Sequence, residues 1–111
     1  MSTADNQVAS SRKDFLQARM KEYGIPNYMQ DSLTQYILTG RSVGEFLSAI
    51  LNNDLAKAVS HGDDMNQPII HMYVKFLYNH APSGCWGRSN STKSWMECGG
   101  LFPRRQPMVT D

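Results

Sequence analysis

Apolar residues recur along this chain at helical spacing, and glycine or proline interrupts the pattern at Gly24, Pro26, Gly40, Gly62 and Pro82. Between these breaks, apolar side chains three or four positions apart share one face of an α-helix, and no segment alternates as a β-strand does. Glycine and proline end helices or begin new ones, so the pattern predicts helices joined by short turns. We therefore predict an all-α fold, a single small bundle of four to five helices with an irregular C-terminal segment.

The first two predicted helices have clear ends. Ser11 and Asp14 form an arrangement like a capping box at the start of the first helix, which runs to Gly24. Pro26 suits the first turn of the second helix, because its missing N–H has no partner there, and Gly40 ends the run. The residues before Ser11 are polar and lack a helical period, and we predict that they form a flexible leader.

The third predicted helix has the broadest apolar stripe. Ser42 and Glu45 form a Ser-x-x-Glu capping box at its start. The triplet Asn52-Asn53-Asp54 in its middle has low helix propensity. Burial of the stripe is expected to outweigh that cost, and a bend or break near Asn53 is the alternative.

The fourth predicted helix is apolar around most of its circumference, which is typical of the central helix of a bundle. Asn66 is its candidate N-cap, Pro68 falls in its first turn, and it runs through His80. Asp63 and Asp64 precede this helix. We interpret these two carboxylates as capping residues rather than as an acid/base pair.

Length and composition limit the domain organisation. A chain of 111 residues, 41% of them hydrophobic, is expected to form one domain with its own core. We divide it into a flexible leader over 1–10, a helical domain over 11–98 with a short last helix near 92–97, and a C-terminal tail over 99–111. The chain shows neither an apolar N-terminal signal region nor an apolar run of the ~20 residues that span a bilayer, which predicts a cytoplasmic protein without a membrane partner.

The net charge is +1, and basic residues are only mildly concentrated. Residues 1–24, 25–82 and 83–111 carry +1, −2 and +2 respectively. Nucleic-acid binders usually present a clustered basic face that neutralises phosphates. Four cations between Arg88 and Arg105 give weak support to such a role, and a solvated basic tail is the simpler interpretation.

The sequence contains no catalytic or metal-binding signature. His61, His71, His80, Cys85 and Cys98 lie within 38 residues, but no two of them have the short spacing of paired zinc ligands. A Cys85 nucleophile with His80 as its base would need an orienting acid and an oxyanion site, and neither is identifiable. We expect two free thiols, a non-enzymatic protein, and no metal or cofactor.

The segment Phe76–Gly87 ends the fourth predicted helix and presents Cys85 and Trp86 on a constrained turn. Trp86 either fills the core or is offered to a partner. Tryptophan and arginine often dominate the energetics of protein interfaces, and the aromatic ring buries a large area. We therefore predict a partner-binding site formed by Trp86, Arg88, Trp95, Phe102, Arg104 and Arg105.

Residues 26–95 resemble a group of small, mostly uncharacterised proteins encoded in phage and prophage genomes. Two segments carry most of the resemblance: Gly44–Leu55, with its Asn-Asp-Leu ending, and Phe76–Gly87, with its Ala-Pro-x-x-Cys-Trp-Gly turn. The group commonly has Gly-Ser-Pro-Glu where this chain has Gly87-Arg88-Ser89-Asn90. The resemblance implies a phage origin and an intracellular role, and it brings no catalytic residue. The other matching residues are Tyr36, Ile37, Asp63, Asn66 and Trp95.

These observations lead to two main functional hypotheses. The preferred one is a non-enzymatic phage protein in the cytoplasm of the infected cell. It would bind and modulate or inhibit a host protein, with a defence complex as one candidate partner (an anti-CRISPR-like role). The alternative is a phage regulatory protein that binds nucleic acid through its basic C-terminal third. A self-associating accessory protein, a homo-oligomer, is the third hypothesis.

Overall fold

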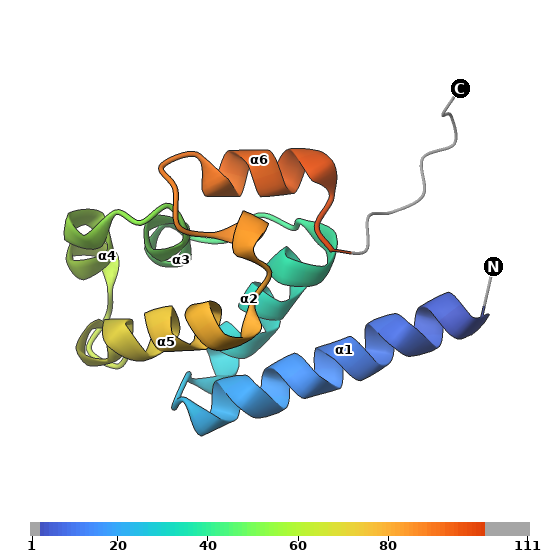
Figure 1. The fold of residues 1–111 in the computed structure, drawn as a ribbon. Helices are drawn as coiled ribbons and strands as arrows, with labels where there is room; N and C mark the ends of the chain where they lie inside the picture. Colours follow the sequence, from blue (N-terminus) through green and yellow to red (C-terminus); the bar gives the residue numbers. More distant parts are fainter. Residues whose placement is uncertain (1–2, 102–111) are drawn as a thin grey trace.

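The structure is a computed structural model that describes the backbone of residues 3–101 and the side chains of residues 12–101. It confirms the all-α fold: within these residues, α-helices and two short 3₁₀ helices follow one another without a strand (Figure 1). In chain order the elements are α1 (Thr3–Glu22), α2 (Asn27–Thr39), α3 (Glu45–Leu51), α4 (Leu55–His61), η1 (Gln67–Ile69), α5 (Ile70–His80), η2 (Ser83–Cys85) and α6 (Ser91–Cys98).

Several helices begin at residues other than those predicted. α5 begins at Ile70, after the 3₁₀ helix η1, and not directly after Asn66. α1 starts at Thr3, so the predicted start at Ser11 is wrong, and part of the expected leader is helical. A helix that has formed gains one backbone hydrogen bond for each residue added, so it extends without an apolar period of its own. α3 has Gly44 as its N-cap and no side-chain cap bond, so the predicted capping box of Ser42 and Glu45 does not form.

The predicted helix ends are confirmed where a glycine supplies a left-handed backbone. Gly24 after α1 and Gly40 after α2 have φ of +79° and +72°. Each N–H also bonds back to the preceding helix, from Gly24 to the Lys21 carbonyl and from Gly40 to the Tyr36 carbonyl. These are the usual terminations of an α-helix, and they depend only on neighbouring residues.

The predicted third helix is two helices, which raises the number of α-helices above the four to five expected. α3 ends at Leu51 and α4 begins at Leu55, so the alternative of a break near Asn53 is confirmed. Asn53 has φ +61° and is the one non-glycine residue with positive φ in the described part of the chain. Asparagine tolerates this conformation better than most side chains do, because its short amide can bond locally.

The helix predicted to be central corresponds to α5, which packs against α1, α3 and η1. α5 buries Tyr73 and Phe76 completely, but it leaves Val74 and Tyr78 exposed on its outer side. α2 buries five residues between Leu33 and Leu38 and packs against α1. The buried residues of α2 are Leu33, Thr34, Tyr36, Ile37 and Leu38.

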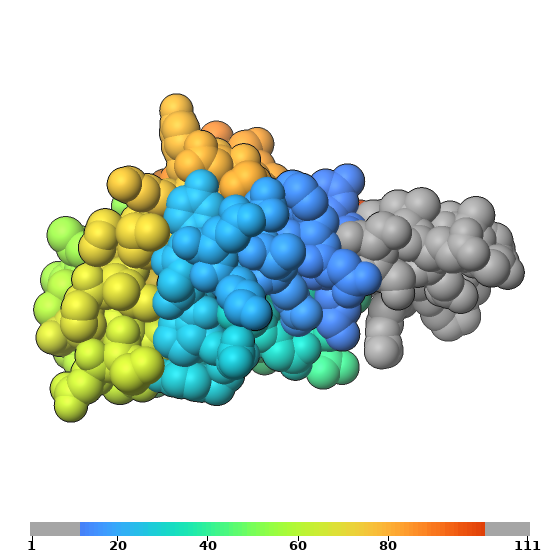
Figure 2. Space-filling view, turned by 90° about the horizontal axis from the view of Figure 1, so that it is seen from below, coloured from blue at the N-terminus to red at the C-terminus, as the bar shows by residue number. Residues whose placement is uncertain are grey.

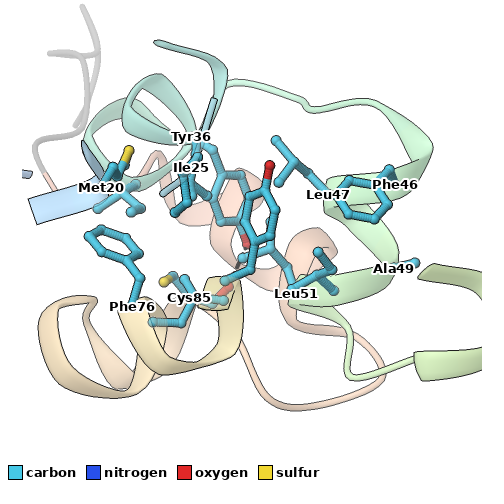
Figure 3. Packing of buried hydrophobic residues seen from close by; sticks show 14 of the residues in the cluster. Met20, Ile25, Tyr36, Phe46, Leu47, Ala49, Leu51, Phe76 and Cys85 are labelled. Atoms are coloured by element: carbon cyan, nitrogen blue, oxygen red, sulfur yellow. Dashed lines mark hydrogen bonds between the residues drawn. The ribbon is translucent and has the colours of Figure 1, made fainter. Parts of the chain in front are cut away.

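The core forms where α1, α2, α3, α5 and η2 meet, and Figure 3 shows their side chains converging. Aromatic rings meet edge to face inside it, with the centroids of Phe46 and Tyr73 5.4 Å apart. Figure 2 shows α1 lying across one face of the molecule beside α2 and α5. α1 contributes Leu16 and Met20 to the core, and Phe15 on the same helix remains 47% exposed. Among the described helices, none combines the length and the apolar character needed to cross a membrane.

Candidate functional site

The Cys85–Trp86 turn is part of the folded core. The Cys85 side chain is fully buried, and its carbonyl accepts a hydrogen bond of 2.8 Å from the hydroxyl of Tyr36. Burial raises the pKa of the Cys85 thiol to about 12, so the thiol is neutral at pH 7 and a poor nucleophile. Cys98 is exposed, and both cysteines are free. This turn therefore fixes the end of α5 against α2.

The indole N–H of Trp95 forms hydrogen bonds within the protein. Its Nε1–H donates to the carbonyls of Tyr36 at 2.9 Å and Ile37 at 3.2 Å, which lie in the last turn of α2. The backbone N–H of Leu101 donates to the same Ile37 carbonyl at 2.9 Å. The last carbonyls of a helix have no partner within it, so these bonds satisfy them. We call this region, formed by Tyr36, Ile37, Trp95 and residues 99–101, the clasp.

The other predicted site residues differ in exposure, and three of them lie outside the described residues. Trp86 is half-buried against the core, and Arg88 is exposed. The N–H of Gly87 donates to the carbonyl of Leu51 at 2.8 Å, which holds the loop that carries Trp86 and Arg88 at the end of α3. Phe102, Arg104 and Arg105 lie outside the described residues.

The triplet Asn52–Asp54, which we call the elbow, has one structural task for each residue. Asn52 accepts a hydrogen bond of 2.9 Å from the Thr92 N–H and donates one of 3.0 Å to the Thr92 hydroxyl, so it caps α6 from outside. Asn53 makes the left-handed turn. Asp54 caps α4 by accepting a bond of 3.2 Å from the Lys57 N–H. The three residues together turn the chain from α3 into α4.

Two grooves meet at the elbow, and Asn53, Asp54 and Leu55 line both of them. The apolar groove lies between α4 and α5 and has a volume of about 40 Å³. Leu55 is 67% exposed between the grooves, although it belongs to an apolar stripe. We call these residues and the two groove linings the elbow face. The other residues of the apolar groove are Ile50, Ala58, Ile70 and Val74.

The polar groove is larger, about 530 Å³, and it is lined mainly by uncharged polar side chains with two carboxylates and one ammonium group. In this groove Oε1 of Glu45 lies 3.2 Å from Nε2 of His61. This contact joins the start of α3 to the end of α4. The loop after Trp86 also reaches this groove through Ser89. The remaining lining residues are Ser48, Ala49, Asn52 and Lys57.

A second polar cluster closes the loop between α4 and α5. Asp63 accepts bonds from the backbone of Asn66 at 2.8 Å and from the hydroxyl of Tyr28 at 2.9 Å, and these bonds lower its pKa. The buried Asn66 side chain accepts a bond from the Tyr73 hydroxyl and donates one of 3.1 Å to the Tyr28 oxygen. Burial raises the pKa of Tyr73. This cluster joins α2, the loop and α5. Asp63 closes the turn before η1, and neither η1 nor α5 has a side-chain cap bond, so the predicted capping of this helix by Asp63 and Asp64 is wrong.

The candidates for metal or catalytic chemistry are dispersed in the structure. His80 packs among aromatic rings, with centroid distances of 5.7 Å to Tyr23 and 5.8 Å to both Phe15 and Phe76. Within residues 12–101, no three His, Cys, Asp or Glu side chains come close enough to share a metal ion.

Comparison with known proteins found no matching family model, no similar curated protein and no similar solved structure. Sequence reasoning missed the elbow face because its grooves form only when α3, α4 and α5 pack together. One local signal pointed to it. A polar triplet that interrupts an apolar stripe, followed at once by Leu55, indicates a turn that leaves a large apolar side chain near the surface.

Proposed function

We propose that this protein is a non-enzymatic binding module that contacts a partner protein through the elbow face. The observation that carries the proposal is Leu55, which is 67% exposed where an apolar and a polar groove meet. A leucine in this position adds little to the core of its own chain. Its full burial against a partner would contribute about 1.5–3 kcal/mol, as much as a core residue contributes to folding.

The loop that carries Trp86 and Arg88 extends the proposed contact surface. It is anchored to the end of α3 by the bond from Gly87 to Leu51, and Ser89 lines the polar groove. An aromatic residue and an arginine beside an apolar anchor are typical of the residues that dominate protein interfaces. Trp86 in this proposal packs on the core with one side and meets the partner with the other.

The resemblance of residues 26–95 to phage-encoded proteins supports a host protein as the partner and the cytoplasm of the infected cell as the place of action. Modulation or inhibition of a host defence complex is the role that we propose first. Nucleic-acid binding remains the alternative. Two of the cations on which it depends, Arg104 and Arg105, lie outside the described residues.

Site-specific cross-linking in host cells tests the proposed function. A photoreactive amino acid replaces Leu55 in one variant and Met96 in another; Met96 is exposed on α6, away from both grooves. The proposal expects a discrete protein adduct from position 55 that is absent from position 96 and survives nuclease treatment. Adducts that appear equally at both positions, or that disappear with nuclease, would contradict it.

Charged substitutions at the same two positions supply the functional comparison. Leu55→Asp is expected to abolish capture of the cross-linked partner, and Met96→Asp is expected to retain it. Leu55 is 67% exposed and Met96 is 38% exposed, and urea unfolding of both variants shows that each remains folded before its binding is compared. If Met96→Asp lost the partner and Leu55→Asp kept it, the contact surface would lie on α6 instead.

A further inference from the structure

We infer that the apolar groove beside Leu55 accepts an amphipathic helix of a partner protein, oriented with a basic residue against Asp54. This inference rests on the proposed function and adds the chemistry of the partner segment. It follows from the size of the groove, the line of apolar residues that continues it, and the charge at its edge.

The size of the groove excludes a small-molecule ligand. Pockets for small molecules enclose about 300–1,000 Å³, whereas this groove has about 40 Å³, which accommodates the end of one aliphatic side chain. Its floor is buried and includes Ala58, a side chain small enough to let an incoming group approach the backbone of α4. Leu55 and Val74 rise on either side and are 67% and 40% exposed. The occupant is therefore a side chain that projects from a larger surface.

The apolar surface continues along α5 beyond the groove. Ile70, Val74 and Tyr78 are four residues apart, and this spacing places them on one side of the helix. Tyr78 is 78% exposed, so the line of apolar side chains ends in an open aromatic ring. A partner helix that inserts one aliphatic residue between Leu55 and Val74 would meet Tyr78 with a residue one or two turns away. This is the helix-in-groove mode of recognition.

The charge at the groove favours a basic partner. Asp54 is the one charged residue among those that line the apolar groove. One of its oxygens caps α4, and Asp54 forms no ion pair with any residue in the described part of the chain. Glu45 adds a second carboxylate in the neighbouring polar groove. Lys57 lines that polar groove and does not line the apolar one. A lysine or arginine beside the apolar anchor of the partner would pair with the exposed carboxylate of Asp54.

Two short helical peptides test the inference directly. Both carry leucines at positions i, i+4 and i+7, and they differ only in flanking lysines or flanking glutamates. Each is labelled with fluorescein and titrated with the full-length protein by fluorescence anisotropy at low and at high salt. The wild type is expected to bind the lysine peptide about two- to fivefold more tightly than the glutamate peptide, and high salt should reduce that preference.

Three variants locate the contact. Asp54→Asn should bring the preference for the lysine peptide close to one, whereas Glu45→Gln, the matched change in the neighbouring groove, should retain most of it. Leu55→Asp should abolish binding of both peptides. Equal binding of the two peptides, a preference that Asp54→Asn leaves unchanged, or no binding of either would overturn the inference. Cross-linking from position 55 would then still show whether the elbow face contacts another kind of partner.

Discussion

The clasp and the elbow both join helices that are distant in sequence, but they differ in what they leave exposed. At the clasp, Trp95 and Leu101 bond to carbonyls at the end of α2, and the chain segments around Gly40 and Gly100 touch. At the elbow, Asn52 makes an equally complete link to α6, yet Leu55 beside it remains 67% exposed. The clasp is therefore a closed joint, whereas the elbow leaves an apolar side chain open to solvent.

The difference shows that a conspicuous sequence motif need not be where apolar side chains are left exposed. The turn with Cys85 and Trp86 draws attention because tryptophan and cysteine are rare, but it mainly closes the core. The Asn-Asn-Asp triplet has three ordinary polar residues, and its geometry places an apolar side chain between two grooves.

The largest expected effect follows from the backbone contact in the clasp. A Cβ at Gly100, where φ is +83°, would lie 2.7 Å from the carbonyl carbon of Thr39 and closer still to the Gly40 nitrogen. Backbone atoms on both sides cannot yield without opening the joint, so Gly100→Ala should cost about 3 kcal/mol or more. Gly24→Ala is the control: its φ is +79°, but its Cβ would meet no atom within 4 Å, and it should cost about 1–2 kcal/mol. Urea unfolding measures both, and equal losses would contradict a closed clasp.

The elbow link should have a smaller, separable contribution. Asn52→Ala removes the acceptor for the Thr92 N–H and the donor to its hydroxyl, and loss of a helix cap of this kind costs about 1–2 kcal/mol. Asn52→Asp retains the acceptor and should lose less. Chemical denaturation gives both values. Identical losses for the alanine and aspartate variants would show that the cap bond to Thr92 is not what stabilises this joint.

The backbone of Asn53 permits a test in the stabilising direction. At φ +61°, glycine avoids the steric cost that a Cβ imposes, so Asn53→Gly should gain about 0.5–1 kcal/mol, and Asn53→Ala should lose about 1 kcal/mol. Shifts in thermal midpoint measure the two changes. Both variants leave Leu55 in place, which separates the stability of the elbow from its use as a contact surface. A loss of stability in the glycine variant would refute this account of the turn.

The smallest expected effect concerns the free energy of unfolding at acidic pH. Hydrogen bonds from the Asn66 backbone and the Tyr28 hydroxyl lower the pKa of Asp63 below its ordinary value of 3.8. The folded state therefore favours the carboxylate, so this stabilisation is present above about pH 4 and is lost as the pH falls through the lowered pKa. Asp63→Asn should make unfolding less dependent on pH in that range. Asp64→Asn, which removes a neighbouring carboxylate with no hydrogen bond in the described residues, should retain the wild-type pH dependence.

Local signals predicted the helices well, because periodicity and helix ends depend on neighbouring residues. The α2 face of Leu33, Tyr36 and Ile37, together with the left-handed stops at Gly24 and Gly40, could be inferred from residues a few positions apart. The start of α1 could not, because helix propagation through its polar first turns gives no periodic signal. The apolar stripe favours a continuous third helix, and this expectation is wrong because the chain turns at Asn53, which has a left-handed backbone.

The site was harder to predict because its determinants are distant in sequence. The sequence predicts Trp95 as a partner-binding residue from its type alone, whereas its indole N–H bonds to the carbonyl of Tyr36, 59 positions away. Likewise, the exposure of Leu55 depends on where α5 lies. Ser89 places the loop of Trp86 and Arg88 at the polar groove, and the role predicted for these two residues stays a proposal.

The attachment of α6 at both ends has a consequence for local unfolding. An eight-residue helix is too short to persist alone in water, so the order of α6 depends on Asn52 at its start and on the clasp at its finish. Opening either end would release the other, which makes the elbow, α6 and the clasp one cooperative unit for amide hydrogen exchange. A ligand held at the elbow should therefore slow exchange at Gly99 and Leu101, at the far end of α6, without touching them.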